Sequence, residues 1–160
     1  MNKRQIVFLI LSVICMALIF FLSSRNSDES TKDSTVVGME IGRITIKNFD
    51  ELPKDEQYEF ALKIDYPVRK TAHATEYMIL SICLFGTFAD AKIRKKILSQ
   101  MLAWGTATLY AATDEIHQLF VGGRAGRVKD VMIDSSGALT GMLIIGIIVL
   151  IINKSKNKKK

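Results

Sequence analysis

The stretch that decides the fold is VMIDSSGALTGMLIIGIIVLII, residues 131–152. It is apolar almost throughout, and its one ionisable side chain is that of Asp134. Its length is close to the roughly 20 residues that a helix needs to cross the hydrocarbon core of a bilayer. The stretch therefore predicts a membrane-spanning helix with one acidic side chain near its N-terminal end.

Three further apolar blocks precede this one: Gln5 to Leu22, Thr71 to Ala89 and Ile97 to Phe120. The whole chain has 160 residues, of which 49% are hydrophobic, and a net charge of +6, values that a soluble domain can also have. The lengths of the blocks favour a membrane protein instead. We predict an all-α integral membrane protein, a single domain over residues 1–160 with four transmembrane helices.

The first block has a competing interpretation as a cleaved signal peptide, because Lys3 and Arg4 precede its apolar core. That core is longer than the 7 to 15 residues usual in such signals. The residues after it, Ser23-Ser24-Arg25, are a poor cleavage site. A retained first helix is the favoured interpretation.

The orientation follows from lysine and arginine, which are enriched in the cytoplasmic flanks of transmembrane helices. These residues precede the first helix, fall between the second and third, and form a basic tail over residues 153–160; they include Lys3, Arg4, Lys92, Arg94, Lys95 and Lys96. Both termini are therefore predicted to be cytoplasmic. Residues 25–70 then form a long extracytoplasmic loop, and residues 121–130 form a short one.

The long loop changes character along its length. Its first part is rich in serine, aspartate and glutamate, which favours caps, turns and solvation over burial. Pro53 then precedes a mixture of charged and apolar residues, which predicts an amphipathic helix over residues 54–65, either at the membrane surface or as a solvated linker. The dipeptide Tyr66-Pro67 predicts a break before the second transmembrane helix.

The predicted topology brings polar residues from three helices to the outer membrane face. The second helix enters from outside, the third leaves toward it, and the fourth enters again. Their outer ends and the short loop carry His73, Glu76, Asp114, Glu115, His117, Gln118, Arg124, Arg127, Asp130 and Asp134. Ionisable residues at such depth are costly and usually functional. We expect these residues to converge on one outward-opening site.

The spacing of small residues supports a shared interior. Ala103, Ala107 and Ala111 fall on one helical face with Asp114 and Gln118, and His73 shares a face with Glu76, Tyr77 and Leu80. Asp130, Asp134, Gly137 and Gly141 form a similar stripe on the fourth helix. Small residues permit close helix packing in lipid. This pattern predicts that the third and fourth helices pack together through their stripes.

Four segments of the chain form a specific combination: residues 20–24, RKTAHATEY at 69–77, DEIHQLF at 114–120 and GRAGRVKDVMIDSSG at 123–137. Together they resemble the VanZ-like family of membrane proteins associated with teicoplanin resistance. Departures occur at Arg25, Ala74 and Gly122, outside the polar constellation. The resemblance implies a multi-pass protein of the bacterial cell membrane linked to glycopeptide resistance, and it supplies no reaction.

Two chemical interpretations apply to the interior polar residues. His73 and Glu76, joined by Asp114 and His117, have the imidazole and carboxylate groups that zinc or manganese binds. The same residues with Asp134 are candidates for acid and base catalysis. Against a metal, the chain lacks an HExxH motif, and a hydrogen-bonded network between helices explains the pattern as well.

The residues at the outer surface suggest binding instead. Arg124 and Arg127 suit bidentate contacts with a phosphate or carboxylate, and Arg69 lies beside the second helix at the same level. With Glu115, Gln118 and Asp130 they form the candidate ligand-binding set. Contacts with ordinary lipid headgroups, or pairing with neighbouring carboxylates, are the simpler explanation. The sequence indicates no particular cofactor.

Two functions follow from these interpretations. In the first, an outer-facing polar pocket binds an envelope lipid or the glycopeptide drug; in the second, the protein is an intramembrane enzyme that modifies a lipid-linked cell-envelope precursor. The expected partners are membrane lipids together with a lipid-linked cell-wall precursor or a lipoglycopeptide. Nucleic acid is not expected as a partner, because the lysine tail adjoins a membrane helix and suits anionic lipid.

Overall fold

The computed structural model describes residues 1–89 and 93–157, and every regular element in those ranges is helical. The elements in chain order are α1 (Lys3–Ser23), α2 (Ser27–Thr45), the 3-10 helix η1 (Phe49–Glu51), α3 (Lys54–Lys63), α4 (Asp65–Phe88), α5 (Ile93–Gln118) and α6 (Val128–Asn157). The predicted all-α fold is confirmed. Lys92 and the last three tail residues lie outside the described residues, so their predicted role in topology is a prediction only.

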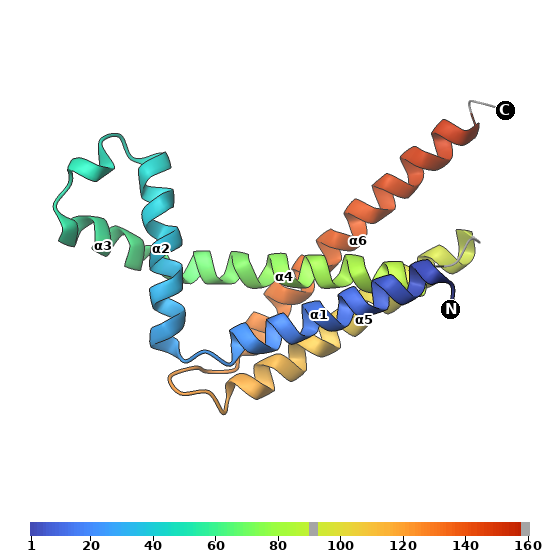
Figure 1. The fold of residues 1–160 in the computed structure, drawn as a ribbon, viewed down its shortest axis with the longest axis horizontal. Coiled ribbons are helices and arrows are strands. Elements are labelled where there is room, and N and C mark those ends of the chain that lie inside the picture. Colours follow the sequence, from blue (N-terminus) through green and yellow to red (C-terminus); the bar gives the residue numbers. More distant parts are fainter. Residues whose placement is uncertain (90–92, 158–160) are drawn as a thin grey trace.

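Four of the helices form a bundle from which the rest of the chain projects (Figure 1). α4 packs against α1, α5 and α6, and α2 with α3 forms an arm at one end. The bundle core contains Tyr77, Leu80 and Leu84 of α4 together with Ile19 of α1 and Met142 of α6. The C-terminal half of α6 diverges from the other bundle helices.

The apolar blocks become bundle helices with shifted ends. α1 begins with a capping box, in which the Asn2 side chain accepts from the Gln5 backbone N–H and the Gln5 side chain accepts from that of Asn2. α5 ends at Gln118 rather than Phe120. α6 is longer than predicted at both ends and runs into the lysine tail, because lysine and asparagine do not interrupt a helix.

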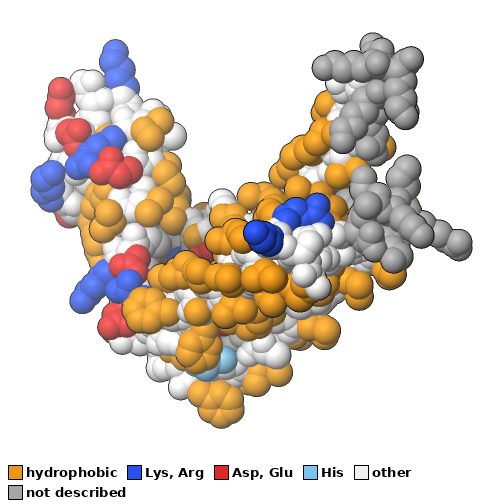
Figure 2. All heavy atoms as spheres, turned by 45° about the vertical axis from the view of Figure 1, so that its right-hand side comes forward, with side chains coloured by type: hydrophobic (Ala, Val, Ile, Leu, Met, Phe, Trp, Pro, Cys, Tyr) orange, Lys and Arg blue, Asp and Glu red, His pale blue; other side chains and the backbone are white. Residues whose placement is uncertain are grey.

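Two of these helices are long and apolar enough to cross a membrane, namely α1 and Val128–Ile152 within α6. Many of their large apolar side chains face outward; Val13, Phe21 and Leu150 are each more than half exposed. Figure 2 shows this apolar surface over the bundle, with acidic and basic side chains gathered on the arm. α4 and α5 carry more charge and do not meet the same criterion among the described residues.

The predicted break at Tyr66-Pro67 is wrong. α3 ends and α4 begins at Ile64, and Pro67 lies in the first turn of α4. Proline is tolerated there because the first N–H groups of a helix have no intrahelical acceptor. His73 is consequently about 12 Å along α4 from its first residue, at 1.5 Å per residue, rather than in the first turns.

The long loop of residues 25–70 is largely helical. Its serine-rich start forms α2, which Asn26 and Glu29 begin through a second capping box. The amphipathic helix predicted for 54–65 is present as α3, preceded by Pro53. Asn26 at the N-cap and the acidic Asp28 and Glu29 in the first turn therefore start a helix in this polar segment.

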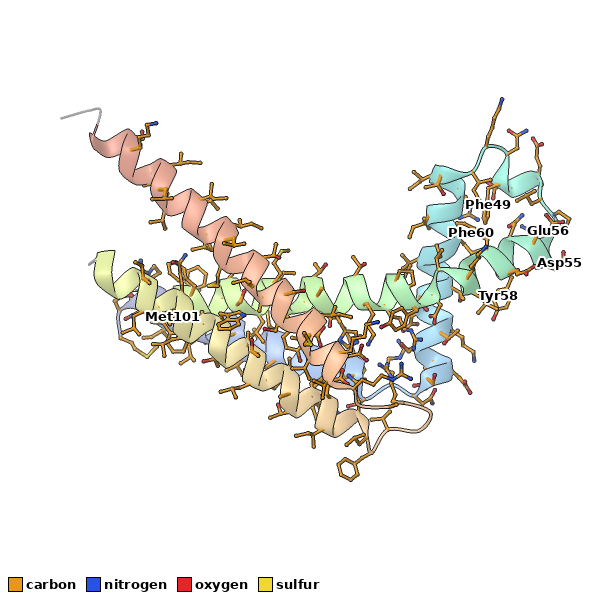
Figure 3. The ribbon with its side chains drawn as sticks, turned by 180° about the vertical axis from the view of Figure 1, so that it is seen from behind. Phe49, Asp55, Glu56, Tyr58, Phe60 and Met101 are labelled. Carbon is orange, nitrogen blue, oxygen red and sulfur yellow. The ribbon has the colours of Figure 1, made fainter. Side chains whose placement is uncertain are left out.

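α2 and α3 pack through a small apolar core of their own. The Phe49 and Phe60 rings meet edge to face with centroids 5.6 Å apart, and both point into the arm (Figure 3). Gly38 and Gly42 permit this approach, since a Cβ on Gly42 would lie 2.4 Å from the Phe49 ring. The arm is therefore a packed helical unit, with Asp55, Glu56 and Tyr58 on its outer side.

The predicted pairing of the glycine stripe is also wrong. Gly137 and Gly141 of α6 face α4: Cβ atoms there would lie 2.1 Å from the Ala74 carbonyl oxygen and 2.7 Å from that of Met78. α5 meets another side of α6, where Trp104 Nε1 donates to the Ser135 carbonyl at 3.2 Å. Helical phase identified the buried face, whereas the partner depends on how the helices are arranged.

Candidate functional site

The polar residues gather at the end of the bundle where α1 and α5 finish and α6 begins. The connection between α5 and α6 lies against the start of α2, because the Ser27 N–H donates to the Gly122 carbonyl at 3.2 Å. Gly123 has a positive φ of 73°, and a Cβ on it would lie 2.9 Å from that of Ser27. Arg124 Nε donates to the Arg25 carbonyl at 3.0 Å. These contacts fix the position of the connection.

The last turn of α5 is held by buried side-chain bonds. Asp114 accepts from the Ser23 hydroxyl at 2.8 Å and from Gln118 Nε2 at 3.1 Å. Glu115 accepts from the Arg127 backbone N–H at 2.8 Å. All three α5 side chains belong to residues at most 5% exposed. This turn therefore ties α1 and the α5–α6 connection together.

α4 joins α6 through an ion pair between Lys70 Nζ and Asp130 Oδ2, 2.7 Å apart. Asp130 is 5% exposed, so the pair is well shielded from solvent. The preceding residue, Arg69, pairs with Asp65 at 2.7 Å, and Asp65 also accepts from Ser34 of α2. The beginning of α4 is thus tied to both α6 and the arm.

A pocket of about 230 Å³ lies among these elements. We call it the polar pocket, and its lining is formed by Ser27, Tyr66, Arg69, Lys70, His73, Gln118, Gly123, Arg124, Ala125, Arg127 and Asp130. A second pocket of about 210 Å³ lies toward α1 and α2 and shares Arg69, His73 and Arg124. The lining of the polar pocket includes four cationic side chains and one carboxylate.

Arg124 lies where the two pockets meet. Its partial burial, followed by the nearby positive charge of Arg69, lowers the pKa of Arg124 below its ordinary value, and Asp114, Glu115 and Asp65 oppose that shift. Guanidinium groups stay protonated in proteins, so the shift reflects first the cost of burying this cation and second its repulsion by Arg69, rather than deprotonation. An anion bound between Arg69 and Arg124 would relieve this repulsion.

The chain matches the family model of VanZ/LLP1 over residues 8–150, which covers the bundle and the arm. The chain belongs to the VanZ/LLP1 family. It is accordingly a VanZ-like membrane protein associated with resistance. No curated protein and no solved structure matches it. The segments on which the sequence resemblance rests include the last turn of α5, the α5–α6 connection and the start of α6.

Most of the predicted ligand-binding residues of this VanZ-like protein lie together. Arg69, Gln118, Arg124, Arg127 and Asp130 all line the polar pocket. Glu115 lies just behind its wall through its bond with the Arg127 N–H. The prediction did not include Tyr66 or Ser27, which line the same pocket. Tyr66 could have been found from helical spacing, since it precedes Lys70 by one turn.

The predicted catalytic residues are more dispersed. His73 lines the polar pocket and its Nδ1 is 3.8 Å from Glu76 Oε2. Asp134 is 1% exposed and lies one turn beyond Asp130 in α6. The His117 ring instead stacks on Phe20 of α1 at 4.5 Å. His117 therefore occupies a different environment from His73.

The predicted metal set of His73, Glu76, Asp114 and His117 is not assembled. Within residues 1–89 and 93–157, no three histidine, cysteine or acidic side chains come close enough to hold one metal ion. Several buried oxygens there have no hydrogen-bond partner among the described residues, including those of Glu76, Tyr77, Asp114, Asp130 and Asp134.

Proposed function

We propose that this protein spans the bacterial cell membrane four times and uses the polar pocket on the outer side to bind the anionic headgroup of an envelope lipid. The observation that carries the proposal is the charge of the pocket lining, where Arg69, Lys70, Arg124 and Arg127 accompany the single carboxylate of Asp130. Phosphate and carboxylate groups match the planar fork of arginine. Such binding would link the protein to resistance against glycopeptides such as teicoplanin.

The position of the charges in α4 and α5 supports spans by these helices as well. Asp114 and Glu115 are buried inside the bundle at the C-terminal end of α5. Arg69 and Lys70 lie near the N-terminal end of α4. Further along α4, the side chains of His73 and Glu76 are only 14% and 26% exposed, and the rest of both middle portions is uncharged. Charged residues in membrane helices usually face the bundle interior or lie near the helix ends. Both helices satisfy that condition.

Cysteine labelling tests the orientation. In a variant with Cys15 and Cys83 replaced by alanine, Gly122→Cys is expected to react with a membrane-impermeant maleimide in intact cells, since Gly122 is exposed. Ser155→Cys, exposed at the opposite end of α6, is expected to react only after the cells are opened. Labelling of Gly122→Cys only in opened cells would refute the proposed orientation.

Headgroup binding is expected to depend on Arg124. Arg124→Gln removes a charged hydrogen-bond donor from the pocket, so the affinity for dioleoyl phosphatidylglycerol should fall about tenfold or more. Native mass spectrometry of the purified protein, titrated with that lipid, measures the change. Arg43→Gln is the matched control, because Arg43 lies on α2 and pairs with Glu40 and Asp50 away from the pocket.

The results of these titrations show whether the ligand of the polar pocket is a lipid or the drug. Equal lipid affinity in the Arg124→Gln and Arg43→Gln variants would overturn the proposal. The same titration with teicoplanin tests the drug as ligand: saturable teicoplanin binding that Arg124→Gln weakens, without any lipid binding, would assign the pocket to the drug. Teicoplanin susceptibility of cells producing each variant then shows whether binding and resistance change together.

An enzyme acting on a lipid-linked envelope precursor is a second candidate. It is favoured by the proximity of His73 and Glu76, which join the polar pocket to the unpartnered oxygens of the bundle interior. A histidine beside a carboxylate can exchange protons with a bound group. Profiling of envelope lipids and precursors in cells with and without the protein distinguishes the two, because only an enzyme would create a new or depleted species.

A further inference from the structure

A separate groove runs along the outside of the bundle between α4 and α6. It has a volume of about 450 Å³ and is lined by Pro67, Lys70, Thr71, Ala74, Thr75, Met78, Ile133, Ser136, Gly137 and Thr140. Its base is the close contact between Gly137 and Ala74. Because Gly137 has no side chain, the two backbones approach there and leave space above them.

The hydroxyl groups in the groove do not make it strongly polar. Thr75 donates to the Thr71 carbonyl at 2.7 Å, Ser136 to the Ile133 carbonyl at 2.6 Å, and Thr140 to the Ser136 carbonyl at 2.9 Å. Each of these three hydroxyls is therefore used within its own helix. The remaining surface comes chiefly from methyl groups, Met78, Ile133 and Pro67, which suit an aliphatic chain.

Lys70 connects the groove with the polar pocket, since it lines both. Its Nζ pairs with Asp130 and lies 5.7 Å from the centre of the Tyr66 ring. The two cavities thus meet at a cationic side chain, with the anion-binding arginines on one side and the apolar groove on the other. This is the charge distribution that a membrane lipid requires.

We propose that the groove holds the acyl chain of the lipid whose headgroup occupies the polar pocket, so that the lipid enters sideways between α4 and α6. The inference rests on the proposed function. It restricts the ligand class to anionic amphiphiles whose acyl chain remains within the membrane. Continuity at Lys70 selects this occupant over a second copy of the protein. A partner helix in the groove would leave the connected cationic pocket unexplained.

Chain-length dependence tests the groove. Wild-type protein is expected to bind dioleoyl phosphatidylglycerol about tenfold more tightly than the dihexanoyl lipid with the same headgroup. Thr140→Trp places a bulky ring in the groove from an exposed position and should remove that preference without altering dihexanoyl binding. The matched control is Met132→Trp, at a position of α6 that is 67% exposed and outside the groove lining.

The results distinguish failure of this inference from failure of the proposed function. A chain-length preference that persists in Thr140→Trp, or is absent from wild type, overturns the groove as the chain site while the pocket proposal stands. If Arg124→Gln binds each lipid as tightly as wild type does, the pocket proposal itself is overturned. Efficient disulfide-linked dimers of Thr140→Cys, in a variant lacking Cys15 and Cys83, would assign the groove to a second copy instead.

Discussion

Replacement of Gly137 by leucine is expected to lower the free energy of unfolding by about 3 kcal/mol or more, the upper end of the range for overpacked sites. A Cβ at this position would lie 2.1 Å from the Ala74 carbonyl oxygen and 2.7 Å from its carbonyl carbon. Backbone atoms cannot move aside as a flexible side chain can. α4 and α6 must therefore separate, which disrupts the largest helix contact in the bundle.

Denaturant titration of the purified protein in detergent, followed by circular dichroism, measures this loss. Gly105→Ala in α5 is the matched control, because a Cβ there meets nothing within 4 Å. That change should be neutral or stabilising, by up to about 1 kcal/mol, since alanine favours a helix more than glycine does. Similar stabilities for Gly137→Leu and wild type would refute the packing of α6 against α4.

Removal of Asp130 is expected to destabilise the protein by about 3 kcal/mol, the cost of leaving a shielded partner charge uncompensated. Asp130→Ala leaves Lys70 next to Arg69 and Arg124 at the polar pocket without its nearest carboxylate. The double variant Lys70→Met/Asp130→Leu removes both charges and should recover much of the loss. The same titration in detergent measures all three proteins.

An exposed ion pair provides the comparison for Asp130. Glu40 pairs with Arg43 on α2, and its side chain is 60% exposed. Glu40→Ala should therefore change stability by less than about 1 kcal/mol, because exposed pairs contribute little. If Asp130→Ala were as mild as Glu40→Ala, the Lys70 to Asp130 contact could not be an important link between α4 and α6.

The buried faces of the bundle helices could be predicted because helical periodicity is local. Ala103, Ala107 and Ala111 are fully buried in the core, as their spacing predicted. Asp130, Asp134 and the two glycines of the α6 stripe are buried as well. A residue's face depends only on its position along one helix, which the sequence contains.

The partners of those faces could not be predicted in the same way. The glycine stripe was assigned to the third apolar block, although it packs on α4. The start of α4 was placed at Thr71 because Tyr66-Pro67 resembled a break, and α2 was not predicted at all. In each case a short sequence pattern is compatible with two different structures. Contacts such as Ser34 with Asp65 and Gly38 with Ala61 select one of them.

In the candidate site, too, some features could be predicted from the sequence and others depend on the tertiary structure. Arg69, Arg124, Arg127 and Asp130 of the polar pocket are predicted from the sequence, because the alternating direction of the helices brings their ends together. Their roles within it were not distinguishable by spacing: His73 lines the pocket, whereas His117 stacks on Phe20. The two histidines lie on different helices, α4 and α5, and which neighbours each ring meets depends on how those helices are arranged.

By itself, the sequence determined the helical class, the buried face of each bundle helix, the collection of polar residues at one end and the resemblance to the VanZ-like family. Tertiary structure alone decided that Gly137 meets Ala74, that Lys70 meets Asp130, and that a groove adjoins the polar pocket. The physical reason is that periodicity and length depend on neighbours along one helix. Helix pairing and cavities depend on distances between segments far apart in the chain.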